Sequence, residues 1–180
     1  MYSSLLRRFP AFNQILPVFA VIAFFAYGRT LFTFAFKFPA WLLFQPLGEI
    51  LSNLAYGLAY NLYESLEILL AFLVICFILP ARFFKDSFVV RGTWLAVTLL
   101  GSVLLYFKFY SSIGPDFLDY IYLWTGVTLP LAVLVAYLGG RISFLQKAAL
   151  WFSDRVIIFV YLLVPASIIS IVVVIVRNIP

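Results

Sequence analysis

The stretch PLGEILSNLAYGLAYNLYESLEILLAFLVICFIL, from Pro46 to Leu79, is a membrane-length apolar run that also contains acidic and amide side chains. Wound as a helix at about 100° per residue, it gathers its polar residues within roughly 50° of one direction. These residues form a polar stripe: Glu49, Asn53, Tyr56, Tyr60, Tyr63, Glu64 and Glu67. Carboxylates within a membrane-length segment are costly, so we expect the polar stripe to face something other than lipid.

The whole chain has the composition of an integral membrane protein. Its 180 residues are 66% hydrophobic and only 11% charged, whereas soluble domains are about a quarter charged. A lipid bilayer is the solvent that stabilises such a surface. The sequence therefore predicts an all-α integral membrane protein, with residues 1–180 forming a single transmembrane domain that is a bundle of about five helices.

Few side chains are available for catalysis or metal binding. The sequence contains no histidine, which removes the commonest general base and a common metal ligand. Its single cysteine, Cys76, lies within the apolar run LVICFIL and is expected to be a small buried hydrophobe. We expect no catalytic residue, no metal and no cofactor. Because the aromatic residues lie in the spans, membrane lipids rather than nucleic acid are the expected partners of the basic residues.

The apolar runs divide the chain into five expected spans. They are placed at about 12–36, 60–79, 92–110, 117–138 and 156–176. Between the first two, the segment KFPAWLLFQP contains Pro39 and Pro46, which interrupt helices. We expect residues 37–59 to form a proline-bracketed interfacial segment that bends near Gly57, because glycine lowers helix stability and permits a kink. The alternative is that the long helix stays straight and projects outward from the membrane.

The charges are unequally distributed between the two sides that five spans define. The amino-terminal head and the connectors after the second and fourth spans carry eight basic residues: Arg7, Arg8, Arg82, Lys85, Arg91, Arg141, Lys147 and Arg155. The other side carries four: Arg29, Lys37, Lys108 and Arg177. Cytoplasmic loops are enriched in lysine and arginine. The bias predicts a cytoplasmic amino terminus and an external carboxyl terminus.

One candidate site lies within the membrane. Glu64 and Glu67 are expected one to two turns inside the outer boundary, and Arg29 of the first span has a similar expected depth. We expect Arg29 to pair with one or both glutamates, because an uncompensated charge there costs several kcal/mol. Tyr60 and Asn61 complete this candidate polar cluster. The pairing is either a structural link between two spans or part of a substrate, proton or lipid-headgroup site.

Four further residues are expected at the membrane–water interface. Trp41 follows the first span, Lys108 ends the third, and Asp119 and Trp124 open the fourth. Tryptophan is enriched at headgroup depth, where its ring is apolar and its N–H reaches polar groups. We interpret these residues as interfacial anchors with local ion pairs.

Three short motifs occur in order over about half of the chain: Arg29-Thr-Leu-Phe32, Gly57-Leu-Ala-Tyr60-Asn61 and Leu79-Pro-Ala-Arg82. Their order resembles the five-span membrane module of lipoteichoic-acid-synthase-like sulfatases of the alkaline phosphatase superfamily. Asn61 stands where that family has an acid. The resemblance implies a membrane module without the family's extracellular catalytic domain, located in the bacterial inner membrane.

These observations favour a non-catalytic membrane protein of the cell envelope. It is expected to act as a subunit, scaffold or lipid-headgroup-binding module of envelope enzymes, with membrane lipids and a possible protein partner within the membrane. The alternative is a small transporter or membrane-embedded transferase that uses Glu64 and Glu67. A water-filled cavity lined by both glutamates would favour the alternative, and a dry, paired contact would favour the scaffold.

Overall fold

The computed structural model describes residues 10–78, 87–110 and 119–179 of the chain. Within these ranges the protein is helical and contains no strand. The helices are α2 (Phe12–Trp41), α3 (Leu47–Ile78), α4 (Phe88–Tyr110), α5 (Tyr120–Gly139) and α6 (Ser143–Asn178). All five are long and apolar enough to cross a membrane. The predicted class, an all-α integral membrane protein with five spans, is confirmed.

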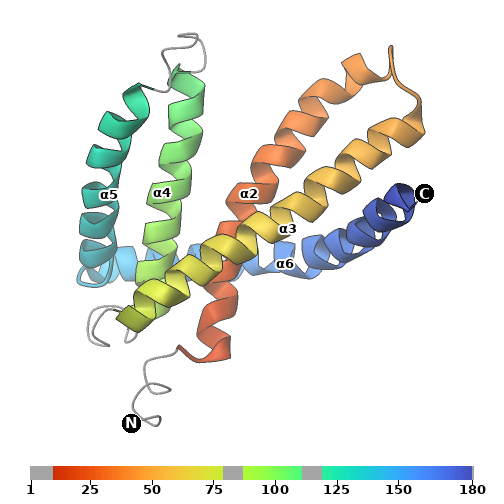
Figure 1. Ribbon diagram of the computed structural model, residues 1–180. Coiled ribbons are helices and arrows are strands. Elements are labelled where there is room, and N and C mark those ends of the chain that lie inside the picture. Colours follow the sequence, from red (N-terminus) through yellow and green to blue (C-terminus); the bar gives the residue numbers. More distant parts are fainter. Residues whose placement is uncertain (1–9, 79–86, 111–118, 180) are drawn as a thin grey trace.

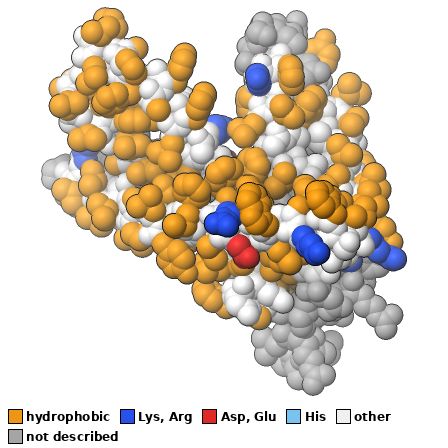
Figure 2. All heavy atoms as spheres, turned by 180° about the vertical axis from the view of Figure 1, so that it is seen from behind, with side chains coloured by type: hydrophobic (Ala, Val, Ile, Leu, Met, Phe, Trp, Pro, Cys, Tyr) orange, Lys and Arg blue, Asp and Glu red, His pale blue; other side chains and the backbone are white. Residues whose placement is uncertain are grey.

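The five helices form two diverging pairs joined by a shared base (Figure 1). The first pair is α2 with α3, and the second is α4 with α5. Helix α6 crosses both pairs and contacts all four other helices. Because α2 also packs on α4, the two pairs meet at one end and separate towards the other. From behind, the space-filling view shows a notch between these two lobes (Figure 2).

The core centres on the first half of α2, where Val18 to Ala23 are almost completely buried. Close approach of α4 is possible because Gly92 has no side chain, and an added Cβ would lie 3.0 Å from Val18 Cγ2. Small residues also occupy the buried side of α6, including Ala149, Ser153 and Ser167. Association in a membrane depends on such close packing, because lipid is as apolar as a leucine side chain.

Helix α2 ends later than the expected first span, and α3 begins earlier than the expected second span. Helix α2 continues through Pro39 to Trp41, and α3 begins directly after Pro46, so only residues 42–46 connect them. The expected separate segment 37–59 is therefore mostly the facing ends of two long helices. The backbone N–H groups of Glu49 and Ile50 donate to Pro46 O, so this proline opens α3 rather than interrupting it. The position of the lipid boundary remains a prediction.

The connector after the expected fourth span is also helical. This connector and the expected fifth span, 156–176, are continuous in the single helix α6, Ser143–Asn178, of 36 residues. At 1.5 Å per residue such a helix is about 54 Å long, well beyond a hydrocarbon core of about 30 Å. The sequence predictions that fall on 1–9, 79–86, 111–118 and 180 lie outside the described residues; they include Arg7, Arg8, Arg82, Lys85 and the Leu79–Arg82 motif.

Candidate functional site

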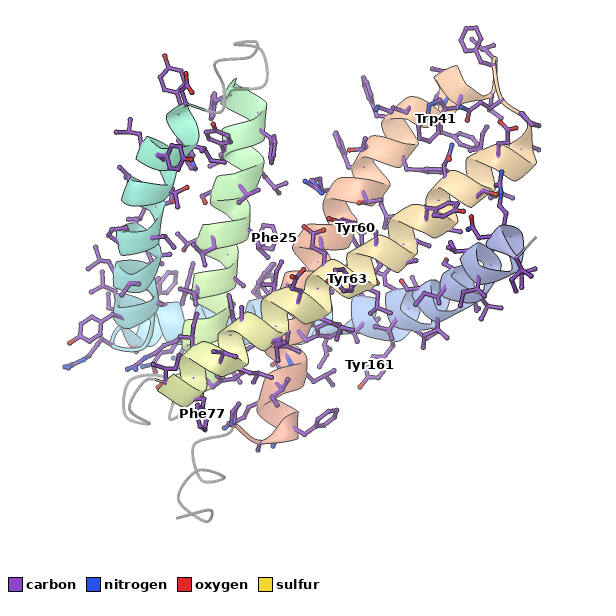
Figure 3. All side chains as sticks on the ribbon, viewed as in Figure 1. Phe25, Trp41, Tyr60, Tyr63, Phe77 and Tyr161 are labelled. Carbon is purple, nitrogen blue, oxygen red and sulfur yellow. The ribbon has the colours of Figure 1, made fainter. Side chains whose placement is uncertain are left out.

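The polar stripe of α3 lies on the side of the helix that the bundle leaves open. The buried side of α3 contains Leu58, Asn61, Ser65 and Phe72, and it packs on α2 and α6. The polar stripe runs along the opposite side, where Tyr60 is 60% and Tyr63 is 63% exposed. Figure 3 shows both tyrosines on the middle of α3. The sequence therefore identified the polar stripe, but it lies outside the core of this chain.

Two members of the polar stripe near the start of α3 have hydrogen-bond partners. Asn53 Nδ2 donates to Gln45 Oε1 at 3.3 Å, in the turn between α2 and α3. Asn178 Nδ2, at the end of α6, donates to the Tyr56 hydroxyl oxygen at 2.6 Å. These contacts hold the α2–α3 turn and the carboxyl end of α6 beside the first half of α3. The second half of the polar stripe has no such contact to another helix within the described ranges.

Arg29 and Glu64 line one small pocket at the floor of the notch. Its volume is about 30 Å³, and its walls come from α2, α3 and α4. The apolar part of the wall includes Phe25, Ile68 and Leu104. The structure thus brings together the arginine and one of the two glutamates that the sequence proposed as partners, at the point where the two lobes begin to separate.

The two charges in this pocket do not form a closed ion pair. Within the described part of the chain, no nitrogen of Arg29 lies within 4.0 Å of a Glu64 or Glu67 oxygen. Oε2 of Glu64 is buried and accepts no hydrogen bond from any described residue. The Arg29 side chain is exposed. A buried carboxylate oxygen without a donor is costly. The pocket therefore presents both charge signs to whatever enters the notch.

The other members of the candidate polar cluster lie elsewhere. Glu67 and Tyr60 are exposed on the polar stripe and do not line the pocket. Asn61 is only 1% exposed and faces α2, where Thr30 Oγ1 donates to its Oδ1 at 3.0 Å. Its Nδ2 has no hydrogen-bond partner among the described residues. Asn61 thus belongs to the helix interface rather than to the pocket.

A buried polar contact between α2 and α6 was not anticipated. Tyr27 and Ser167 are both 0% exposed, and their hydroxyl oxygens are 2.6 Å apart. One weak indication was present in the sequence, since Ser167 is among the few polar residues of its span. Tyr27 offered no indication, because tyrosines occur throughout this chain and the three in the polar stripe are exposed.

The four expected interfacial residues lie near helix ends. Trp41 is the last residue of α2, and its ring packs against Phe34 with centroids 5.7 Å apart; Figure 3 shows it beside the α2–α3 turn. Lys108 is exposed in the last turn of α4, and Asp119 is exposed just before α5. The ring of Trp124 lies 5.6 Å from that of Tyr106. Their depth in a membrane stays a prediction.

The site chemistry is that of recognition by charge and hydroxyl groups. No group of three or more His, Cys, Asp or Glu side chains that could hold a metal occurs in the described ranges. The pocket offers a guanidinium, which binds phosphate or carboxylate oxygens, and a carboxylate, which accepts N–H or O–H donors. The adjoining polar stripe adds tyrosine hydroxyls and the Glu67 carboxylate.

The fold and this site define a helical integral membrane protein with five candidate spans. No family model, no curated protein and no solved structure matches the chain.

Proposed function

We propose that this chain is a non-catalytic subunit or scaffold of a membrane complex in the cell envelope, and that the polar stripe of α3 receives its partner. The observation that supports the proposal is the exposure of Tyr60, Tyr63 and Glu67 on a helix of membrane-spanning length. Exposed polar residues on such a helix need a polar neighbour, which this chain does not supply within the described ranges.

The energetics favour a partner over lipid. Glu67 lies about three helical turns before the end of α3 at Ile78. An acidic side chain at the centre of a span raises the free energy of insertion by about 3 kcal/mol. A partner that donates hydrogen bonds to Glu67 and the two tyrosines would remove much of that cost. This stabilisation is present only while the complex is assembled.

The pocket at Arg29 and Glu64 extends the same docking surface into the notch. A polar group that reaches the pocket from the polar stripe would meet the exposed Arg29 guanidinium, while Oε2 of Glu64 is buried in the pocket wall. The pocket itself, at about 30 Å³, has room for about one water molecule, so lipid-headgroup binding is proposed at the exposed Arg29 guanidinium rather than inside the pocket. The alternative of a transporter or transferase requires a water-filled cavity bordered by both glutamates, and Glu67 does not border the pocket.

We place the protein in the bacterial inner membrane, with its amino terminus cytoplasmic. Support comes from the eight-to-four bias in basic residues and from the resemblance to the envelope sulfatase module. In intact cells, a membrane-impermeant thiol reagent should label Lys37→Cys and spare Lys147→Cys. The native Cys76 is buried and adds little background. Labelling of Lys147→Cys alone would indicate the opposite orientation, with the amino terminus outside.

Site-specific photocrosslinking tests the docking surface. A photoreactive residue replaces Tyr63 in one variant and Tyr161, which is 67% exposed on α6, in the control. Figure 3 shows Tyr161 pointing away from α3. Irradiation of native membranes should give a protein adduct of defined mass at Tyr63 only, and adding Glu67→Leu should weaken it. A second copy of the chain counts as such a partner.

Two outcomes would refute the proposal. One is equal protein crosslinking at both positions, because docking would then not depend on the polar stripe. The other is the recovery of lipid adducts alone at Tyr63 together with a monomeric protein after gentle purification.

A further inference from the structure

A long apolar groove follows the seam between α4 and α5. Its volume is about 500 Å³, within the range of about 300–1,000 Å³ typical of ligand pockets. Leu95 and Leu99 of α4, Leu129 and Val133 of α5, and Ile75 of α3 line its length. The floor is formed by Ala132 and Ala136, which lie one turn apart on α5 and are almost completely buried. Small residues on one side thus create space for a flexible hydrocarbon chain.

The end of this groove near the α5–α6 turn is basic and aromatic. Arg91 and Tyr137 line it there, and the Arg141 guanidinium carbon lies 5.2 Å from the centre of the Tyr137 ring. The Arg91 side chain packs so closely on Gly140 that an added Cβ would overlap its guanidinium. Two cations therefore flank the turn at one end of an otherwise apolar groove.

A second groove on the same helix pair provides an internal comparison. It has nearly the same volume, about 480 Å³, and is also almost wholly apolar. Its lining includes Tyr120, Leu123 and Trp124 but no lysine or arginine. Apolar volume alone therefore does not distinguish the two grooves. The difference is Arg91 in the lining of the first groove and Arg141 beside its Tyr137, since basic residues attract anionic groups near a membrane surface.

We propose that the first groove is a binding site for an anionic phospholipid. One acyl chain lies along Leu95, Leu99 and Val133, and the phosphate-bearing headgroup lies at the α5–α6 turn beside Arg91 and Arg141. Tyr137 separates the apolar and charged parts of the site, as aromatic side chains do at the headgroup level of a bilayer. This site is independent of the α3 polar stripe and of the Arg29–Glu64 pocket.

Native mass spectrometry of the purified protein tests this site with two probes, phosphatidylglycerol and the zwitterionic phosphatidylcholine. The wild type should bind phosphatidylglycerol more tightly. Arg141→Gln should weaken that binding about fivefold, the effect of one basic residue near a charged lipid surface, and leave phosphatidylcholine binding unchanged. The matched control Arg177→Gln removes an exposed cation at the far end of α6 and should change neither.

A groove-filling variant tests the acyl-chain part. Val133, 64% exposed in the groove, is replaced by Trp; the control is Ile168→Trp at a 55% exposed position of α6 outside both grooves. Only Val133→Trp should reduce phosphatidylglycerol binding. Leu134→Trp, also in the groove, repeats the test if Val133→Trp loses helical circular dichroism. Equal binding of the two lipids by the wild type, or equal losses in the Val133 and Ile168 variants, would overturn the proposal.

Discussion

The buried contact between Tyr27 and Ser167 allows a quantitative test of how α2 is held to α6. Both side chains are completely buried, and their oxygens are 2.6 Å apart. Hydrogen bonds between membrane helices average about 0.6 kcal/mol and reach about 1.7 kcal/mol in double-mutant cycles. A short contact without solvent should lie in the upper part of that range, so we expect a coupling energy of about 1–1.5 kcal/mol.

The two single substitutions should have unequal effects. Ser167→Ala leaves a buried tyrosine hydroxyl without a partner, at a cost of about 1–3 kcal/mol. Tyr27→Phe leaves the serine, which can turn to a carbonyl of its own helix, as Ser170 does by donating to Ala166 O at 2.8 Å. Tyr27→Phe should therefore cost less, and the loss in the double variant should be smaller than the sum of the two single losses by the coupling energy.

The free energy of unfolding can be measured in detergent micelles by circular dichroism during titration with a denaturing detergent. Ser170→Ala is the matched control, because its hydroxyl bonds within its own helix, and it should cost less than Ser167→Ala. Strict additivity of Tyr27→Phe and Ser167→Ala would refute the reasoning, since it would mean that the two hydroxyls do not interact.

Two further predictions concern packing and the pocket. Gly139→Ala should destabilise the protein by about 1–3 kcal/mol, because the new methyl group would overlap the Trp94 ring, whose Nε1–H donates to Leu145 O at 3.1 Å. Thermal unfolding of this variant should be compared with that of Gly126→Ala, whose added Cβ would meet no atom within 4 Å. Arg29→Gln should lower the melting temperature in detergent more than the combined change with Glu64→Gln, because the single variant leaves one uncompensated charge in the pocket. Equal losses would show that the two charges do not interact.

The candidate site was only partly predictable. The sequence indicates how deep a residue lies in the membrane more readily than it indicates the direction in which the side chain points. Counting residues from the span ends placed Arg29 and Glu64 at a similar depth, and the structure puts both in one pocket. The same count placed Glu67 at a similar depth, yet that side chain does not line the pocket. The polar stripe was identified correctly as a helix face. The structure places this stripe outside the core of the chain, because α3 buries the opposite face.

The sequence by itself determined that the chain is a membrane protein with five helices, since hydropathy and length are local properties of each segment. Local pattern did not determine which face of each helix is buried. In a membrane, an apolar side chain is equally well solvated by lipid and by protein, so hydrophobicity cannot orient a helix. The buried face of each helix is determined by close packing of small residues such as Gly92 and Ser167, together with a few buried hydrogen bonds. These contacts join segments far apart in the chain, and only the tertiary structure decided them.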